Sequence, residues 1–127
     1  PSKRDKGTIP AHPKGVMDLK FSPDGRYLAS TGYEGTLKIW STQQWGRIQT
    51  IELEGSGVFA LAVSPDSSTL AVTVTYTVYL IDAANGHLKK SLKVNPKGVY
   101  KLDFSPDGKW LAVAAADGKV RVWDVTE

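Results

Sequence analysis

Apolar and polar residues alternate in three short runs between residues 16 and 41, the period expected where one face of a β-strand is buried. In the first run, Met17, Leu19 and Phe21 fall on one face of the predicted strand. Turns with the sequences Ser-Pro-Asp-Gly and Glu-Gly separate the runs; Pro fixes φ there and Gly accepts a positive φ. The pattern predicts an antiparallel meander of three strands.

The same pattern occurs twice more along the chain. Residues 99–124 repeat it closely, and residues 58–82 repeat it in a weaker form. The prolines of the corresponding turns, Pro23, Pro65 and Pro106, are 42 and 41 residues apart. A period of this length, with about four strand-sized segments in each unit, is typical of a radially repeated β architecture.

A further apolar position precedes each copy at a constant distance. Ile9, Ile51 and Leu92 each lie seven residues before the valine that opens the following copy. We therefore expect a fourth, outer strand before each copy, including one near the N-terminus. Pro10 is tolerated there because an outer strand has one side that need not donate to a ladder.

The three copies resemble WD40 repeats, a likeness carried by the Ser-Pro-Asp turns and by Trp40 and Trp123 at the ends of third strands. The resemblance covers nearly the whole chain and implies an all-β fold, a partial β-propeller of three four-stranded antiparallel WD40-like blades. The repeats are expected at about 3–45, 46–85 and 86–127 of a single segment, 1–127. Because propellers need about four to eight blades to close, these three would close only with further blades or another protomer.

In WD40 proteins a hydrogen-bonded set of His, Ser or Thr, Asp and Trp often ties a blade together. The first copy has a glutamate where the aspartate is usual. The matching residues are His12, Ser30, Glu34 and Trp40 in the first copy and Asp117 and Trp123 in the third. The resemblance implies a structural network in which a carboxylate orients the imidazole and no buried polar group lacks a partner. A catalytic interpretation of His12, Ser30 and Glu34 is disfavoured because no nucleophile-elbow sequence surrounds Ser30.

The resemblance also implies where a partner binds, since the position after the opening valine lies near the narrow rim of the central channel in this family. The candidate partner-binding residues are Met17, Phe59 and Tyr100 at this position, with Tyr33 and Tyr76 of the second turns expected at the same end. Large apolar and aromatic side chains suit the anchoring of a protein or peptide. The alternative is packing between blades, because the first three share a strand face with Leu19, Leu61 and Leu102.

We predict a non-enzymatic protein–protein interaction scaffold with a peptide- or protein-binding rim. An electrostatic binder of nucleic acid or an anionic surface is the alternative, since the net charge is +3 and the pI about 9.2. Many basic residues fall in the predicted outer strands, however, where lysine opposes edge-to-edge aggregation. A propeller enzyme or ligand-binding domain is less favoured because the channel positions are apolar.

No cofactor or metal is expected. The sequence contains no cysteine, which excludes disulfides and fits a cytoplasmic location, and no signal peptide is visible. Asp24, Asp66 and Asp107 each stand alone in a turn, unlike the ligands of a calcium loop. His12 and His87 lie in different copies, which disfavours a zinc site. No apolar run is long enough to span a membrane.

Three blades would leave apolar faces open at both flanks. We expect Leu37, Ile39, Val120 and Val122 to be exposed there, and a large exposed apolar patch normally marks an association surface. Either the chain is an excerpt of a longer propeller, or copies assemble, two of them giving six blades. The predicted partners are a protein or peptide at the rim and further blades or a second copy at the flanks.

Overall fold

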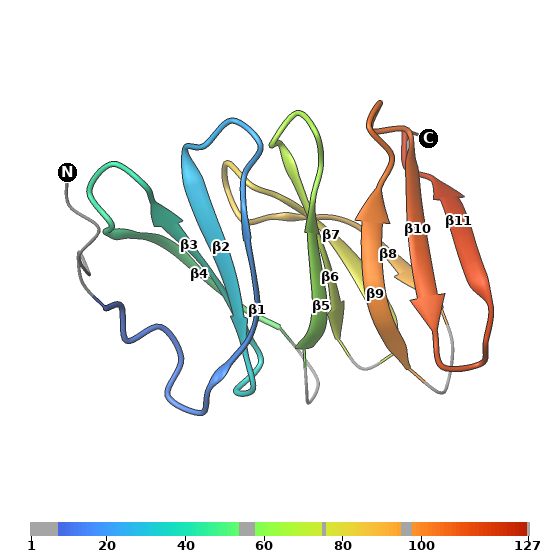
Figure 1. Cartoon of the computed structure of the whole chain (residues 1–127), viewed down its shortest axis with the longest axis horizontal. Helices are drawn as coiled ribbons and strands as arrows, with labels where there is room; N and C mark the ends of the chain where they lie inside the picture. Colours follow the sequence, from blue (N-terminus) through green and yellow to red (C-terminus); the bar gives the residue numbers. More distant parts are fainter. Residues whose placement is uncertain (1–7, 54–57, 75, 95–97, 127) are drawn as a thin grey trace, which may run out of the picture.

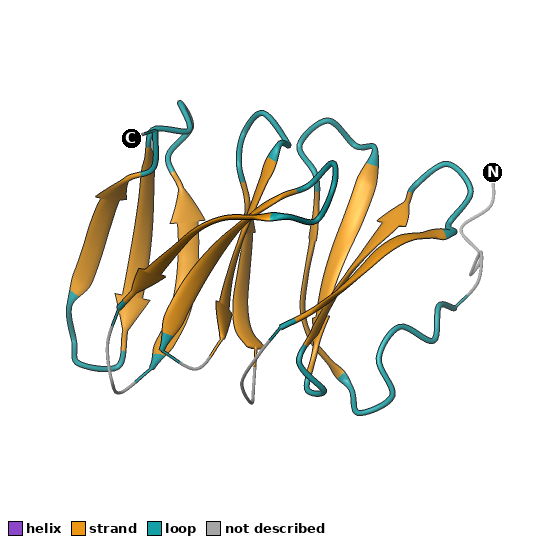
Figure 2. Cartoon of the chain, turned by 180° about the vertical axis from the view of Figure 1, so that it is seen from behind, coloured by secondary structure: helices purple, strands orange, loops and turns teal. Residues whose placement is uncertain are grey.

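The structure is a computed structural model that describes residues 8–53, 58–74, 76–94 and 98–126, without the side chains of residues 47, 48, 58 and 59. Within these residues the chain forms eleven β-strands joined by loops and turns (Figure 1, Figure 2). The strands are β1 (Val16–Phe21), β2 (Tyr27–Gly32), β3 (Thr36–Ser41), β4 (Arg47–Glu52), β5 (Val58–Val63), β6 (Thr69–Val74), β7 (Thr77–Asp82), β8 (Leu88–Lys93), β9 (Val99–Phe104), β10 (Trp110–Ala115) and β11 (Val120–Asp124). The all-β prediction is confirmed.

The strands form three antiparallel sheets in chain order. The first two have the strand orders β1-β2-β3-β4 and β5-β6-β7-β8, and the third contains β9, β10 and β11; we call these sheets blade 1, blade 2 and blade 3. The opening strands β1, β5 and β9 lie next to one another, so the blades stand side by side around one line of first strands (Figure 1). The row of blades is not closed, as predicted for a partial β-propeller.

Blade 3 departs from the prediction of four strands in every blade, because the described residues give it three, with β11 at its edge. Blades 1 and 2 take their outer strands, β4 and β8, from the segment that leads into the next copy. An outer strand was also expected near Ile9, but residues 8–15 form none. By the same rule this segment would complete a sheet before blade 1, and the described residues contain no such sheet; Lys38 holds the segment by donating to the Ala11 carbonyl.

Two apolar cores lie between the blades and hold them together. The first joins blade 1 to one face of blade 2, and its largest buried side chains are Leu37, Ile39, Leu61, Leu70 and Ile81. The second joins the other face of blade 2 to blade 3, and it includes Val78, Leu80, Leu102, Leu111 and Val113. Burying a side chain of this size contributes about 1.5–3 kcal/mol. Blade 2 is therefore covered on both faces, and blades 1 and 3 on one face each.

The Ser-Pro-Asp turns between the first two strands of each blade are self-contained hydrogen-bond networks. In blade 2, Ser64 Oγ and the Ser68 backbone N–H donate to Asp66 Oδ1 at 2.7 and 3.0 Å, and the Thr69 N–H donates to Ser64 Oγ. Asp24 and Asp107 accept corresponding bonds in the other blades. The serine hydroxyl and the backbone N–H groups lower the pKa of all three aspartates, that of Asp66 to about 2.

A second network ties the N-terminal segment to blade 1. Trp40 Nε1 donates to Ser30 Oγ at 3.0 Å, and Ser30 Oγ lies 2.9 Å from His12 Nε2. His12 Nδ1 lies 2.5 Å from Glu34 Oε2, which also accepts from Thr36 Oγ1. These partners assign the tautomer: Nδ1–H donates to the glutamate, and Nε2 accepts from the serine hydroxyl. The structure thus brings together the four residues that the resemblance implied for the first copy.

Gly32 provides the space that this glutamate requires. A Cβ on Gly32 would lie 2.4 Å from both Glu34 Oε1 and His12 Nδ1. The corresponding positions in blades 2 and 3, paired with the opening valine, carry Val74 and Ala115. Burial raises the pKa of Glu34, but the hydrogen bonds from Thr36 and His12 outweigh it and lower the pKa to about 2. The methylene by which Glu exceeds Asp is accommodated because residue 32 has no side chain.

Asp117 and Trp123 of blade 3 do not join a comparable network. Arg121 Nη2 and Nη1 donate to Asp117 Oδ2 and Oδ1 at 2.6 and 3.2 Å, and the hydrogen bond from Arg121 is the main cause that lowers the pKa of Asp117 to about 2. Trp123 is half-buried against the core between blades 2 and 3. Asn95, at the histidine position of this copy, lies outside the described residues. Asp117 is therefore the ion-pair partner of Arg121.

The close fit of Gly32 against Glu34 predicts a coupled pair of substitutions. Gly32→Ala is expected to destabilise the protein by about 1–3 kcal/mol, because the added Cβ overlaps Glu34 and His12. Adding Glu34→Asp shortens the carboxylate side chain and should recover part of this loss. Urea unfolding of the single and double variants measures the coupling energy, expected to be about 0.5–3 kcal/mol.

Gly46→Ala is the matched control, since a Cβ on Gly46 has no neighbour within 4 Å. It should change the free energy of unfolding by less than about 0.5 kcal/mol. Strictly additive losses for Gly32→Ala and Glu34→Asp would contradict the explanation.

The lowered pKa of Asp66 predicts a pH-dependent contribution to stability. A carboxyl group with a pKa of about 2 in the folded protein, below the ordinary 3.8, stabilises the fold fully above its unfolded pKa and loses this effect as the pH falls toward 2. Wild type should therefore be more stable than Asp66→Asn at pH 7, and the difference should shrink between about pH 4 and pH 2. Denaturant unfolding of both proteins across this range measures it, and a difference independent of pH would refute the assignment.

Candidate functional site

The candidate rim lies at one end of the blades, where the first strand begins and the second ends. A β-bulge occurs there in each blade, between Val16 and Asp18, between Val58 and Leu61, and between Val99 and Lys101. A bulge inserts an extra residue and redirects its side chain. Met17 and Tyr100 are the inserted residues of blades 1 and 3, so they leave the alternation that the sequence pattern assumed.

The bulge separates Tyr100 from the core residue with which it was expected to share a face. Tyr100 is 64% exposed, whereas Leu102 on the same strand is buried. Met17 is half-buried. Phe59 belongs to β5, but its side chain lies outside the described part of the structure. Tyr100 therefore does not pack in the core between blades 2 and 3.

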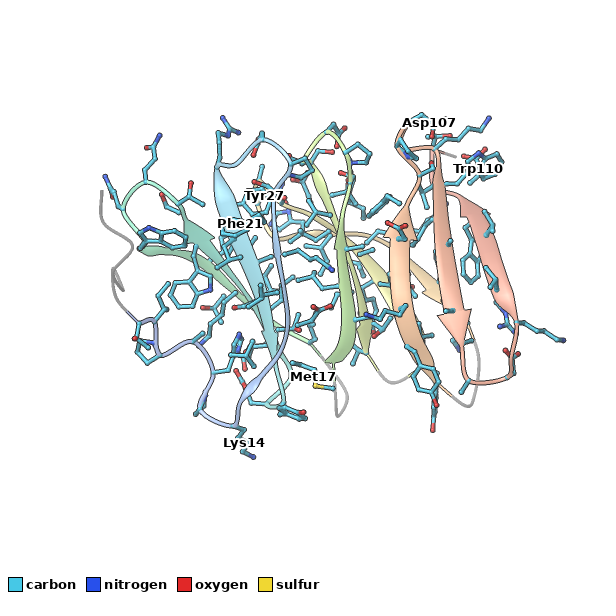
Figure 3. The ribbon with its side chains drawn as sticks, viewed as in Figure 1. Lys14, Met17, Phe21, Tyr27, Asp107 and Trp110 are labelled. Atoms are coloured by element: carbon cyan, nitrogen blue, oxygen red, sulfur yellow. The ribbon has the colours of Figure 1, made fainter. Side chains whose placement is uncertain are left out.

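Two further tyrosines lie at the same end, in the turns that join the second and third strands. Tyr33 is 56% exposed and Tyr76 is 49% exposed. The Tyr33 ring lies against Gly15, because a Cβ at residue 15 would be 3.2 Å from Tyr33 Cδ2, and the Tyr33 N–H donates to the Gly15 carbonyl. Figure 3 shows Met17 and Lys14 at this end and Asp107 and Trp110 at the other. We call Met17, Tyr33, Tyr76 and Tyr100 the rim.

The open flanks carry exposed apolar side chains, but not all of those expected. On blade 3, Val120 is 70% exposed and Val122 is 58% exposed, as predicted. Leu37 and Ile39 were also expected to be exposed, and this is wrong, because they face blade 2 and are fully buried. The open face of blade 1 is the opposite one, where β1 exposes Leu19 and Phe21.

The basic residues of the outer strand β8 are exposed to solvent. Lys89, Lys90 and Lys93 all lie on this strand, as the edge-protection argument expects. Lys89 Nζ donates to Thr69 Oγ1 at 2.8 Å. Their placement along one outer strand fits a solvated sheet edge, and nothing in it favours binding of nucleic acid.

Among the described residues, no group of side chains is arranged for metal binding or for hydrolysis. No group of three or more His, Cys, Asp or Glu side chains in this part of the chain could hold a metal ion. Ser30 is buried and bonded to both His12 and Trp40, so it is not presented to a substrate. The described residues also include no helix of the length and apolarity that a membrane crossing requires.

Three features of the site escaped the sequence interpretation. The bulges were missed, although they recur at the same position of all three copies. The role of Gly32 was missed, although the signal was available: the one copy with Glu in place of Asp is also the one with Gly two residues earlier. A groove between blades 2 and 3, lined in part by Leu80, Lys89 and Phe104, was missed because it depends on how two copies pack together.

Comparisons with known proteins agree with this architecture. The sequence profile of the WD40 family (WD domain, G-beta repeat) matches residues 3–41 and 86–124, more than half of the chain. WD repeat-containing protein SL1-17 of Schistosoma mansoni is 33% identical over 94% of this chain and 40% of its own length. Target of rapamycin complex subunit wat1 of Schizosaccharomyces pombe is 31% identical over 86% of this chain and 36% of its own.

A solved structure shows the same fold. The β-propeller domain of Myceliophteria thermophila Cps50 (Swd1) superposes with a TM-score of 0.84 and 22% identity, over 96% of this chain and 38% of that one. The chain thus spans about two fifths of the length of the relatives that it matches. The sequence profile, the relatives and the sheet topology agree: the chain belongs to the WD40-repeat β-propeller family.

Proposed function

We propose that this chain is a non-enzymatic segment of a protein-interaction scaffold and that its rim binds a protein or peptide. The observation that carries the proposal is the exposure of Tyr33, Tyr76 and Tyr100 at one end of neighbouring blades. Tyrosine is enriched among residues that dominate binding energy, because it combines a large apolar surface with a polar group. The bulges support this role, since they direct side chains out of the sheet at a fixed place in each blade.

The relatives support the general class. The wat1 relative is named as a subunit of the target of rapamycin complex, and it aligns with most of this chain. A protein that works inside a complex needs surfaces that bind other chains. The rim is the surface of this kind that the WD40 resemblance indicated.

A second proposal concerns the flanks, which we assign to contacts with further WD40 blades. Leu37 and Ile39 of β3 hold the same places as Val120 and Val122 of β11, each two and four residues after the glycine of the preceding turn. In blade 1 this face is buried against the apolar face of blade 2. Val120 and Val122 of blade 3 therefore form an apolar face of the kind that a neighbouring blade covers. That blade comes either from the rest of a longer chain or from a second copy.

Removing the rim tyrosines should reduce partner binding without unfolding the protein. The variant carrying Tyr33→Ala and Tyr100→Ala is expected to capture its partners from a native extract at least tenfold less efficiently, because one contact of about 1.4 kcal/mol already gives a factor of ten. Quantitative mass spectrometry of the captured proteins measures the loss. Far-UV circular dichroism should be unchanged, since both rings are exposed.

Trp45→Ala is the matched control for this experiment. Trp45 is an exposed aromatic residue in the β3–β4 loop, at the opposite end of the blade. Its replacement should leave capture unchanged. Equal losses from the rim and control variants would reject the rim as the binding surface.

If the covering blade comes from a second copy, the isolated chain should associate. Wild type should run above the 13.8 kDa monomer mass in size-exclusion chromatography with light scattering. Replacing Val120 and Val122 together by lysine should shift the population to monomer, because charged groups resist burial at an apolar contact. Leu88→Lys, at a similarly exposed apolar position of β8, should leave the association state unchanged. A wild-type monomer at all concentrations would exclude association through the flanks.

A further inference from the structure

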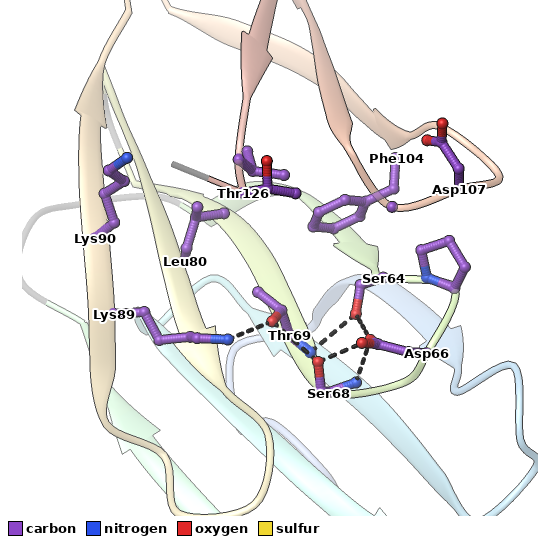
Figure 4. A pocket seen from close by; sticks show the side chains of 13 residues that line it. Ser64, Asp66, Ser68, Thr69, Leu80, Lys89, Lys90, Phe104, Asp107 and Thr126 are labelled. Atoms are coloured by element: carbon purple, nitrogen blue, oxygen red, sulfur yellow. Dashed lines mark hydrogen bonds between the residues drawn. The ribbon is translucent and has the colours of Figure 1, made fainter.

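A groove separates blades 2 and 3 at the end of the molecule opposite the rim. Its volume is about 500 Å³. Leu80, Phe104 and Val125 supply apolar surface within it, and the turns that contain Asp66 and Gly108 form one side (Figure 4). It is large enough, and apolar enough, to hold a side chain of another protein.

The other side of the groove is basic. Lys89 and Lys90 of β8 lie along it, and both residues are exposed (Figure 4). The hydrogen bond from Lys89 Nζ to Thr69 Oγ1 holds its ammonium group over the groove. Asp66, on the turn side, already accepts three hydrogen bonds from Ser64 and Ser68. A carboxylate that enters the groove is therefore favoured on the lysine side.

The corresponding groove between blades 1 and 2 shows what such a space accepts. There Tyr27 reaches from blade 1 to blade 2, and its hydroxyl donates to the Ser67 carbonyl at 2.7 Å. The ring is buried, and burial is the main cause that raises the pKa of Tyr27 to about 12, which keeps the hydroxyl protonated as a donor. The protein thus uses a tyrosine from its own chain to bridge these two blades.

In blade 2, the position equivalent to Tyr27 is not a tyrosine, so no ring bridges from it to blade 3. Thr69 holds the place of Tyr27, since each N–H donates to the serine of its own Ser-Pro-Asp turn. Gly108 holds the place of Ser67, because each N–H donates to the carbonyl of the turn serine. A threonine side chain is too short to reach across this groove, whose volume is about 500 Å³.

We propose that the groove between blades 2 and 3 binds a tyrosine of a partner protein that is flanked by an acidic residue. The ring packs on Leu80, Phe104 and Val125, and the hydroxyl donates to the Gly108 carbonyl as Tyr27 donates to that of Ser67. The neighbouring carboxylate pairs with Lys89. This is a second interaction surface, at the opposite end from the rim and independent of it.

The test uses the peptide acetyl-Glu-Tyr-Glu-amide as the probe. Titration into the ¹⁵N-labelled chain should shift the amide signals of Thr69, Leu80 and Gly108, and the fitted affinity should exceed that of acetyl-Glu-Ala-Glu-amide by about tenfold or more. Lys89→Gln should weaken binding of the tyrosine peptide and reduce its dependence on salt. Equal affinity for the two peptides, or signal shifts confined to the rim, would overturn the proposal.

Substitution of Thr69 supplies a matched pair of variants. Thr69→Tyr introduces the side chain that blade 1 carries at this place, so the protein should fill its own groove, keep its fold and lose the peptide response. Thr69→Ser leaves the groove open, keeps the hydroxyl that accepts from Lys89 Nζ and should retain binding. Continued binding by a folded Thr69→Tyr variant would show that the peptide occupies another site and would reject the groove.

Discussion

Face-to-face burial of neighbouring sheets is the constraint on which this structure depends. No disulfide or helix supports the described sheets, so each blade is stabilised by the apolar face of the next. Blade 2 shows how far this contact suffices. At the positions of Ser30 and Trp40 in blade 1, blade 2 has Val72 and Ile81, which cannot form the polar network. Val72 and Ile81 are nevertheless fully buried. A polar network within a blade is dispensable when both faces of the sheet are covered, because the apolar contacts of two neighbours then fix its position.

The two ends of the blades use polar groups differently. At the end with the Ser-Pro-Asp turns, each carboxylate is satisfied within a few residues of its own chain, and the same solution appears in all three blades. At the rim end, residues far apart in sequence must meet, as His12 and Glu34 do. Local networks repeat faithfully with the sequence, whereas long-range networks vary from blade to blade. The rim can therefore differ among copies while the sheets remain alike.

Much of the fold was predictable because period-two alternation and turn chemistry act locally. Alternation and the Ser-Pro-Asp turns placed the three strands of every copy, and the spacing of Ile51 and Leu92 placed β4 and β8. The same rule gave no strand at Ile9, because a strand there would complete a sheet before blade 1, and the described residues contain no such sheet. It also failed to choose between sheet faces: Leu37 and Val120 hold equivalent places, and only the order of blades in space decides that one is buried and the other exposed.

The candidate site was less accessible to sequence reasoning. Tyr100 was assigned to the face of Leu102 because alternation was assumed to run through the strand, and a single inserted residue separated them. Asp117 was aligned with Glu34 and therefore expected in a network with a histidine. In the structure it pairs instead with Arg121, four residues later on the same chain. The groove between blades 2 and 3 depends on the difference between Thr69 and Tyr27, whose meaning appears only when two blades are placed together.

The placement of β4 and β8 has a consequence for how the chain folds during its synthesis. Each outer strand is encoded after the three strands that it completes, and only a short linker separates it from the opening strand of the next blade. A ribosome therefore releases all four strands of blade 1 before any strand of blade 2, and the apolar face of blade 1 stays uncovered until blade 2 has emerged. Each newly made sheet is covered by the next one, which links the maturation of neighbouring blades to the direction and pace of translation.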